Sequence, residues 1–515
     1  MSHTKKALSK SRLLSFRQCP LRLWNEVHRR DQKTEPDGAA QARFDNGNRV
    51  GELAQQRWPG GVLIDAEYWD IDTALKQTQV ALNDPETTAI YEACFVAYRT
   101  SVRVDVLVRV GLQEWELWEV KSVLNPKEIH SYDYAVQLAV TRAWAAEQGH
   151  PLTIRRGGIL HLNRDYVFDG VAYDCQTLFA EHDLTAEVGE FHDEVQQAFV
   201  TAAAVVDNET PPTIQPGNHC GDPYVCPFLG TACAEPPLDE LFLLPRIRAS
   251  RVEDWHTSGI DRLDQLDPEA DGLNPVQARV WQAHMDGALQ VVPGLRQQVE
   301  AIGYPRYHLD FESTGSWMAL PRWKGTRPFQ PVPFQFSLHL ERAPGQLVLH
   351  DGYLHCDASD PRRPVAEALI QQTSIVPGPI LTYSGYEKQM ISQLIDASPD
   401  LEPDLEAIRA RFVDLLPIVR DHVYHPDFGG SFSIKQVLPA LVDDLSYEGL
   451  GIADGDTAAL SYLEMIDLLS AENATPDQQA RAAKIRQDLW LYCKRDTEAM
   501  VALMARLEEL ANNPG

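Results

Sequence analysis

The sequence lacks long hydrophobic runs and low-complexity blocks, and it is poor in positive charge. No stretch of about 18 apolar residues is present, which argues against a membrane-spanning helix and a membrane partner. The N-terminus is basic but has no apolar centre of the kind found in secretory signals, so we expect a cytoplasmic protein with reduced cysteines. With 46 Lys and Arg against 74 Asp and Glu, the net charge is −28, which argues against a general nucleic-acid coat protein.

Positive charge is concentrated at the start of the chain. Residues 1–33 contain nine Lys and Arg but only two acids, Glu26 and Asp31. A local basic arm on an acidic protein can follow a phosphate backbone. A merely solubilising N-terminus is a comparable interpretation for Lys5 to Lys10.

Residues 104–122 predict a β-hairpin that carries two acids and a lysine. Two segments rich in β-branched and aromatic residues flank a turn around Leu112. A hairpin centred there places Asp105 opposite Glu119, and the two-residue period puts Glu119 and Lys121 on one face. The carboxylates can hold a divalent metal, with Lys121 beside the attacking water or the scissile phosphate. The common alternative is the solvated face of a half-buried sheet.

A helix predicted from residue 132 carries Gln137 soon after this hairpin. The order D…E-V-K-S followed by a Gln-bearing helix resembles the PD-(D/E)xK nucleases of the RecB type. The resemblance implies an α/β nuclease domain over residues 1–237. It also implies catalytic roles for Asp105, Glu119, Lys121 and Gln137.

One position departs from that family. The segment FDNGNRVGE, residues 44–52, corresponds to one that usually ends in a metal-binding His, and Gly51 stands at that position. Glu52 is the nearest candidate substitute. The missing His favours, for this domain, the alternative of a nucleic-acid-binding scaffold that has lost activity.

The cysteines form a second pattern. Three lie close together in a Gly- and Pro-rich stretch with ligand-like spacing, namely Cys220, Cys226 and Cys233. Cys19, at a Cys-Pro step in a predicted helix, can supply a fourth ligand if the chain returns to its start. This pattern resembles the iron–sulfur nucleases of the RecB and AddB type and implies a 4Fe–4S cluster. Their triplet is usually spaced more tightly, so zinc and uncoordinated thiols remain alternatives. The other cysteines, Cys493 among them, are expected to be ordinary buried thiols.

The C-terminal part predicts a different arrangement of acids. YPRYHLDFES is a strand with Asp310 and Glu312 on one face, and residues 333–341 and 347–354 are expected as its neighbours. A helix that follows a short apolar strand begins near Glu387. The last helix carries Tyr492 and Asp496 four residues apart, and hence on one face.

This series resembles the DnaQ-like exonucleases of the DEDDy type, which implies an RNase H-like domain with a mixed sheet over residues 301–515. In such a domain Asp310, Glu312, Glu387 and Asp496 bind Mg²⁺ or Mn²⁺, and Tyr492 orients the attacking water. The position of Glu387 is normally an Asp. For D-x-E alone, an exposed pair on a strand is the structural alternative.

Two further segments suit nucleic acid. Residues 238–300 contain a Ser-Gly-Ile turn between amphipathic stretches and resemble a helix-hairpin-helix, although a plain spacer is an equal alternative. A loop interleaves basic and aromatic residues, as single-strand binding requires: Arg322, Trp323, Lys324 and Arg327. The aromatics of that loop can equally anchor it to the core.

The order of parts resembles a bacterial family that joins a RecB-like iron–sulfur nuclease to an RNase H-like exonuclease domain. We therefore expect an α/β protein that acts as a metal-dependent DNA nuclease, with single strands or ends as substrate, in DNA repair or defence against foreign DNA. An RNA exonuclease is the alternative among enzymes. A catalytically weak nucleic-acid-binding scaffold is the alternative from another class.

Overall fold

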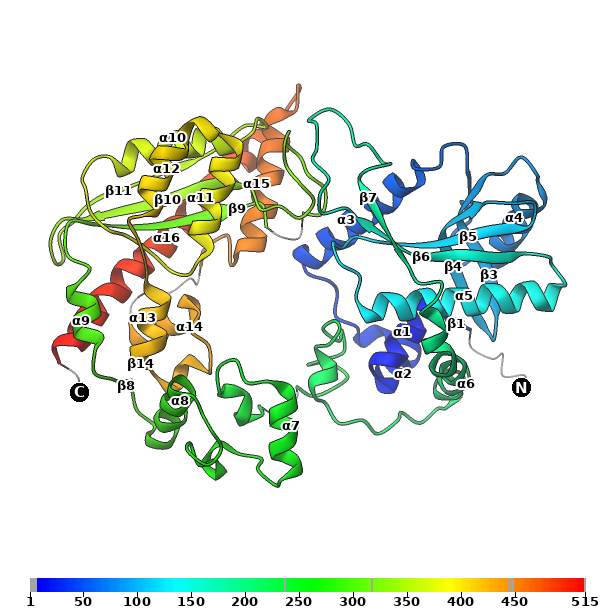
Figure 1. Ribbon diagram of the computed structural model, residues 1–515, viewed down its shortest axis with the longest axis horizontal. Helices are drawn as coiled ribbons and strands as arrows, with labels where there is room; N and C mark the ends of the chain where they lie inside the picture. The colour runs from blue at the N-terminus through cyan, green and yellow to red at the C-terminus, as the bar shows by residue number, and fades with distance from the viewer. Residues whose placement is uncertain (1–6, 236–237, 316–317, 443–444, 446–448, 514–515) are drawn as a thin grey trace. The chain divides into compact units, whose positions relative to one another are not determined.

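The computed structural model describes residues 7–235, 238–315, 318–442, 445 and 449–513 (Figure 1). It divides into two compact units, one of Met1–Pro237 with Trp317–Gln330 and one of Leu238–Ser316 with Pro331–Gly515. Each unit combines helices with a sheet, so the expected α/β class is confirmed. No helix within the described ranges is long and apolar enough to cross a membrane.

The sheet of the first unit is built around the predicted hairpin. Its strands are β1 (Leu8–Ser9), β2 (Val62–Leu63), β3 (Ala89–Ala97), β4 (Thr100–Arg109), β5 (Glu114–Lys121), β6 (Thr153–Leu162) and β7 (Phe179–Asp183). Strands β2 to β7 follow one another across the sheet, and β1 pairs with β4. In the β4–β5 ladder Val106 faces Trp118 and Leu107 faces Leu117, which confirms a hairpin centred on Leu112. β5 and β6 run parallel and are joined by α5 (Glu128–Gln148).

Helices cover both faces of this sheet. One core joins the sheet to α1 (Lys10–Gln18), α2 (Pro20–His28), α4 (Ile71–Asn83), α5 and α6 (His192–Asp207). On the other face, α3 (Gly38–Gln55) packs on alternate residues of the same strands, such as Val106 and Trp118. The alternation follows from the two-residue period of a strand, which sends successive side chains to opposite faces.

Local expectations for the first unit hold in part. The helix break at Cys19-Pro20 is confirmed, since Pro20 starts α2 where its missing N–H costs nothing. Residues 166–168 form no strand although they are aromatic and β-branched, and β7 forms at 179–183. α5 begins at Glu128, one turn before the expected residue 132.

The second unit has a five-stranded mixed sheet in the order β11-β10-β9-β12-β13. The strands are β9 (Arg306–Ser313), β10 (Pro333–Glu341), β11 (Leu347–Leu354), β12 (Ile380–Thr382) and β13 (Phe412–Asp414). β9, β10 and β11 are antiparallel, whereas β12 is parallel to both β9 and β13. The strands expected at 333–341 and 347–354 are confirmed. Residues 412–414 form β13, and a helix starts directly after it at Leu415.

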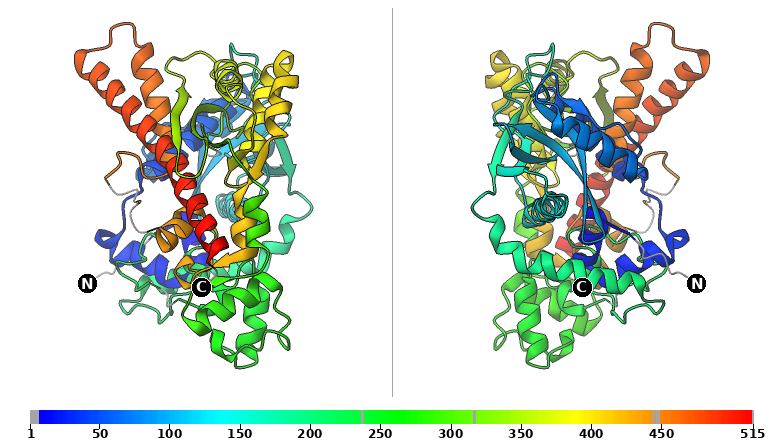
Figure 2. Two further views of the ribbon diagram at one scale, coloured as in Figure 1. Left: turned by 90° about the vertical axis from the view of Figure 1, so that its left-hand side faces the viewer. Right: turned by 90° about the vertical axis from the view of Figure 1, so that its right-hand side faces the viewer.

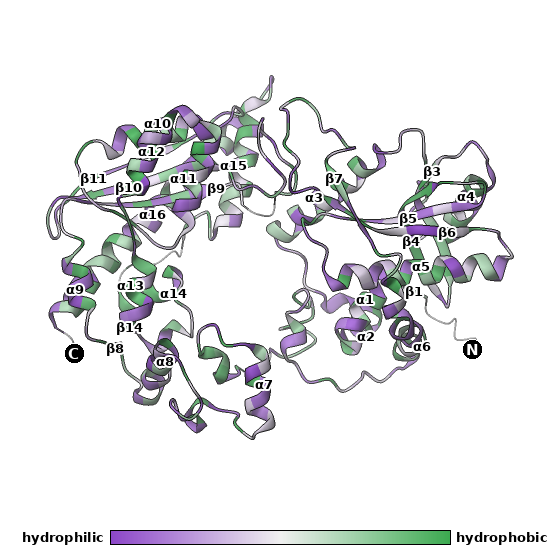
Figure 3. Ribbon diagram, viewed as in Figure 1, coloured by the Kyte–Doolittle hydropathy of each residue, from purple (hydrophilic) through white to green (hydrophobic). Residues whose placement is uncertain are grey.

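Two helical layers enclose this sheet. α10 (Arg362–Thr373), α11 (Tyr386–Ala397) and α12 (Glu402–Arg409) share a core with one face. On the other side, α16 (Pro476–Asn512) contacts β9 and β10, and α15 (Gly455–Ser470) lies beside it (Figure 2). Many helices carry both hydrophilic and hydrophobic residues, as an amphipathic covering layer requires (Figure 3).

The segment that follows residue 238 belongs to the second unit. It contains α7 (Ala249–Thr257), α8 (Pro275–Asp286), β8 (Gln290–Val291) and α9 (Leu295–Glu300). β8 pairs with β14 (Val423–Tyr424). Side chains of α7 and α8 share one core with α13 (Leu415–His422), α14 (Ile434–Leu441) and the end of α16. These helices are therefore packed into the C-terminal unit.

Two candidate active sites and a cysteine cluster

The first unit brings together the four residues expected on the hairpin and the following helix. Asp105 on β4 accepts a hydrogen bond from the backbone N–H of Val120, at 2.7 Å. Glu119 on β5 is buried, and the amide of Gln137 on α5 donates to its Oε2. Lys121 Nζ lies 2.6 Å from Glu119 Oε1. The pairing of β4 with β5 and the packing of α5 are enough to assemble this set.

Two residues that sequence patterns did not single out complete the site. Asp133, one turn before Gln137 on α5, lies 2.5 Å from Lys121 Nζ through its Oδ2. Lys10 Nζ lies 2.7 Å from Glu119 Oε1 and 3.4 Å from Asp133 Oδ1. Helical spacing from Gln137 could have found Asp133. Lys10 follows β1, and only the pairing of β1 with β4 brings it here, so no local signal marks it.

The two lysines balance the carboxylates of this site. Burial opposes ionisation of Glu119 most strongly, yet the ammonium groups of Lys10 and Lys121 hold its pKa well below the usual range. Burial, followed by the charge of Glu119, raises the pKa of Asp105 and of Asp133. The site thus holds one firmly ionised carboxylate between two cations of the protein itself.

Glu92 on β3 is a further acid that faces this cluster. Its backbone φ is +57°. The β3–β4 ladder pairs Tyr91 with Val106 and Ala93 with Val104, and it includes no partner for Glu92 between them. A positive φ costs a residue other than glycine roughly 1–3 kcal/mol, and such strain gathers at functional sites. Burial raises the pKa of Glu92. The charge of Lys10 opposes this increase, and the charge of Glu119 adds to it.

Glu52, the residue expected to replace the missing His, does not contact the acid site of the first unit. Gly51 lies within α3, and a Cβ built on it meets no atom within 4 Å, so the chain leaves room for a side chain there. Glu52 is exposed and pairs with Arg49 at 2.8 Å. Glu92 is therefore a better placed additional acid than Glu52.

The four cysteines expected to act together do converge. Cys19, Cys220, Cys226 and Cys233 line one small cavity, so the chain does return to its start. The N–H of Cys226 donates to the carbonyl of Cys220 at 2.7 Å, and the Asn25 amide donates to Cys233 Sγ at 3.6 Å. Among the described residues, the one group of three metal-binding atoms within 4.8 Å of one another lies in the second unit. No three of the four described sulfurs therefore lie within 4.8 Å of one another, whereas the sulfurs of a tetrahedral zinc site with bonds of about 2.3 Å would all lie roughly 3.8 Å apart.

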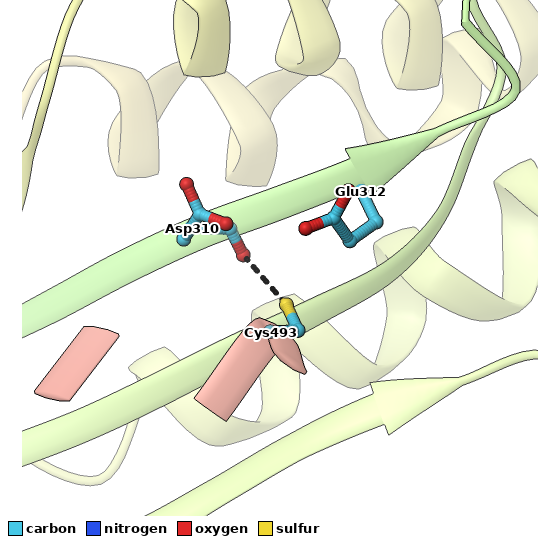
Figure 4. Close-up of side chains that lie close together, drawn as sticks. All are labelled: Asp310, Glu312 and Cys493. Atoms are coloured by element: carbon cyan, nitrogen blue, oxygen red, sulfur yellow. Dashed lines mark hydrogen bonds between the residues drawn. The ribbon is translucent and has the colours of Figure 1, made fainter. Parts of the chain in front are cut away.

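In the second unit, that group of three is Asp310, Glu312 and Cys493 (Figure 4). Both acids point from β9 toward α16, and Cys493 Sγ contacts the backbone carbonyl of Asp310 at 3.9 Å. Burial, followed by the charge of Asp496, raises the pKa of Asp310 and of Glu312 well above the usual range. Cys493 is buried as expected, but it lies inside the acid site.

The remaining acids come from two helices. Glu387 is in the first turn of α11, 2% exposed, and its Oε2 finds no hydrogen-bond partner among the described residues. Burial raises the pKa of Glu387 to about 8, with Asp414 adding to the effect. Asp496 on α16 is four residues after Tyr492, and its charge reaches both acids of β9. The four predicted carboxyls are thus brought together by β9, α11 and α16.

One lysine lies beside this second site. Lys435 Nζ on α14 lies 3.1 Å from the hydroxyl of Tyr492 and 3.2 Å from the carbonyl of Ala453. Its charge partly offsets the raised pKa values of Asp310 and Glu312. The position of Lys435, far from Tyr492 in sequence, carries no motif, and we did not expect it at the site.

The loop expected to bind single strands is part of the first unit. Trp323 is 5% exposed, and the backbone of Phe168 bonds to Thr326 at 2.9 Å. This burial favours the alternative in which the aromatics anchor the loop. Arg327 donates to the carbonyl of Asp165 at 3.1 Å, and the Arg322 guanidinium lies 5.9 Å from the Trp323 ring, whereas Lys324 is exposed. In the basic N-terminal arm, Lys5 and Lys6 lie outside the described residues.

Comparison with known proteins adds one match. Residues 307–433 match a family described as a domain of unknown function, DUF2779. The matched range includes Asp310, Glu312 and Glu387 and ends before Tyr492 and Asp496. No curated protein and no solved structure gives a significant match to the chain.

Proposed function

We propose that the protein is a metal-dependent nuclease whose C-terminal site trims single-stranded DNA from the 3′ end. The observation that carries this proposal is the convergence of four carboxyls from three elements onto one buried place. Packing alone gives no reason to gather them, since buried like charges raise the free energy of the folded state. Divalent cations relieve that repulsion, and phosphodiester hydrolysis is the chemistry they support with this ligand set.

The topology of the two units supports the same proposal. In the second unit, a central first strand bearing D-x-E, two antiparallel neighbours on one side and two parallel strands on the other form the arrangement expected of an RNase H-like exonuclease. In the first unit, the antiparallel β3-β4-β5 followed by α5 and the parallel β6 fits a RecB-like PD-(D/E)xK core.

The donors of the C-terminal site fit Mg²⁺ or Mn²⁺, which take carboxylate oxygens. Asp310, Glu312, Glu387 and Asp496 would hold the ions. The ions would supply charge stabilisation for the entering and leaving oxygens. Lys435 Nζ donates to the hydroxyl oxygen of Tyr492, and a tyrosine hydroxyl that accepts one hydrogen bond can still donate another. Tyr492 would thereby orient the attacking water without being a ligand.

The N-terminal site is proposed as a second nuclease centre of weaker metal affinity. Asp105 and Glu119 would hold its metal, and Lys121 and Gln137 would contact the scissile phosphate or the water. Lys10 already occupies Glu119 Oε1, so a metal would have to displace it. This contact favours, for the first unit alone, the second candidate function of a nucleic-acid-binding domain with little activity.

We further propose that Cys19, Cys220, Cys226 and Cys233 hold a 4Fe–4S cluster that joins the start of the chain to the end of the first unit. The absence of three described cysteine sulfurs within 4.8 Å of one another supports this, because a cubane cluster holds its cysteine sulfurs further apart than a single zinc ion does. Brown protein with broad absorption near 400 nm after anaerobic purification is the expected result. Colourless protein with one equivalent of zinc would exclude the cluster and leave the cross-link intact.

The test of function is digestion of end-labelled single- and double-stranded DNA and RNA with Mg²⁺ or Mn²⁺. We expect stepwise shortening of single-stranded DNA from the 3′ end. Degradation of RNA alone would identify an RNA exonuclease. Intact DNA and RNA after incubation with fully metallated protein would identify a nucleic-acid-binding scaffold instead.

A further inference from the structure

The first unit contains a cavity of about 750 Å³ that opens onto its acid site. Lys121, His130 and Asp133 form part of its lining, and the helices α1 and α2 form much of the rest. The volume is in the range of ligand sites, roughly 300–1,000 Å³. Lys121, which bridges Glu119 and Asp133, thus forms part of the wall of this cavity.

Positive charge dominates the lining. Arg12, Arg30 and Lys33 belong to it, and within the described part of the chain neither Arg30 nor Lys33 forms an ion pair. Arg12 donates to the backbone carbonyl of Ala7 at 2.6 Å, which is an uncharged acceptor. Arg22 also lines the cavity and is paired with Glu26 at 3.3 Å. On a chain of net charge −28, uncompensated cations beside one cavity indicate an anionic ligand.

Two aromatic side chains complete the lining. Tyr68 and Trp69 are adjacent, each is 69% exposed, and their ring centroids lie 5.1 Å apart with the planes at 78°. They precede Asp70, the N-cap of α4, so the rings project from a well-defined helix start. Exposing two large aromatic rings forgoes the free energy that their burial would contribute, which indicates a binding role for them.

We propose that this cavity binds a single-stranded polynucleotide, with Tyr68 and Trp69 stacking on unpaired bases and Arg12, Arg30 and Lys33 contacting phosphates. Stacking on aromatic side chains requires bases whose faces are open, and in a duplex the neighbouring base pairs cover those faces. The inference rests on the proposed nuclease function, because it makes the cavity the approach of the substrate to the N-terminal site.

Binding is measured in EDTA, so that no strand is cut, by the fluorescence anisotropy of labelled oligodeoxythymidine. Trp69→Ala is expected to weaken binding roughly ten-fold, the effect of losing one stacked base. Phe44→Ala is the matched control, since Phe44 is 60% exposed on α3 and lies outside the cavity lining. A labelled duplex should bind equally well to wild type and Trp69→Ala.

The proposed phosphate contacts are tested by the salt dependence of single-strand binding. Lys33→Ala should lower the slope of log affinity against log salt by about 0.7, whereas Lys76→Ala, an exposed lysine on α4, should leave it unchanged. The inference is overturned if wild type does not bind the single strand, or if Trp69→Ala binds as well as Phe44→Ala. If Trp69→Ala binds the single strand as well as wild type and the protein still cleaves DNA, the inference is wrong but the proposed nuclease function stands. Trp69-dependent binding without cleavage in Mn²⁺ would overturn the function alone.

Discussion

The two acid sites of this chain differ in how their charge is balanced. In the first unit, Glu119 lies between Lys10 and Lys121 at 2.7 and 2.6 Å, and its pKa is held low. In the second unit, Asp310 and Glu312 lie among further acids, and their pKa values are raised. Carboxyl groups on the strands of the two sheets thus have pKa values shifted in opposite directions, down for Glu119 and up for Asp310 and Glu312. The comparison teaches that the protein's own cations neutralise Glu119 in the first site, whereas the proposed metal ions would have to neutralise the carboxyls of the second.

The largest expected effect separates the sites by activity. Asp310→Asn removes a ligand and should lower 3′-end trimming of single-stranded DNA by at least about a thousand-fold, since metal ligation contributes several kcal/mol to the transition state. Lys121→Ala should leave this trimming unchanged and abolish any activity of the first site. The rates are measured on end-labelled strands with Mn²⁺. Equal trimming rates for wild type and Asp310→Asn would show that the C-terminal acid site is not responsible for trimming.

A cysteine variant tests whether the units respond separately. Cys19→Ala should lower the unfolding temperature of the first unit by an amount that corresponds to about 3–5 kcal/mol, because it opens a long cross-linked loop that restricts the unfolded chain. Scanning calorimetry should show the second transition unmoved. Cys356→Ala, a substitution in the second unit away from both acid sites, is the control. A Cys19→Ala protein as stable as wild type would rule out the cross-link.

The site residues that the sequence predicted are those whose partners are local or periodic. Hairpin register brought Asp105 and Glu119 to the same end of the β4–β5 ladder, and strand period placed Asp310 beside Glu312. Lys10 could not be predicted, because it depends on pairing between β1 and β4, some ninety residues apart. Periodicity shows which face a residue occupies and not which distant residue meets that face.

The same limit applies elsewhere in the fold. The last helix was predictable because Tyr492 and Asp496 share a face, but the contact of Lys435 with Tyr492 joins α14 to α16 and has no sequence signature. Glu92 reaches its site through a positive φ that strand patterns do not reveal. The sequence of the loop around Trp323 has a nucleic-acid-binding pattern, and the burial of Trp323 favours the anchoring alternative.

The pH dependence of stability should differ between the units. Glu387 has a folded pKa of about 8, so between pH 4.5 and 8 the folded state binds more protons than the unfolded chain. The free energy of unfolding of the metal-free second unit should therefore fall, by about 2–3 kcal/mol from pH 6 to 8. Over the same range the contribution of Glu119, whose pKa is lowered, is constant. Glu387→Gln should flatten the calorimetric profile, and Glu52→Gln should not; a profile that rises with pH in wild type would contradict the account.

The smallest expected effect is an increase in the metal affinity of the first site when one of its lysines is removed. Lys10→Met removes one cation from Glu119, and Mn²⁺ should bind the first site roughly ten-fold more tightly, as expected for the loss of about 1.4 kcal/mol of competing interaction. Isothermal titration in an Asp310→Asn background isolates this site. Lys76→Met, an exposed lysine outside the site, serves as control. Unchanged affinity in Lys10→Met would show that Lys10 does not compete with the metal.

The central claim is that charge balance decides which site holds a metal. Its most direct test is the stoichiometry of tight Mn²⁺ binding in two matched variants, Asp310→Asn and Asp105→Asn, each of which alters one carboxylate on a central strand. The account predicts that Asp310→Asn loses the tight sites and that Asp105→Asn keeps them. Loss of tight binding in Asp105→Asn, with full binding in Asp310→Asn, would contradict it.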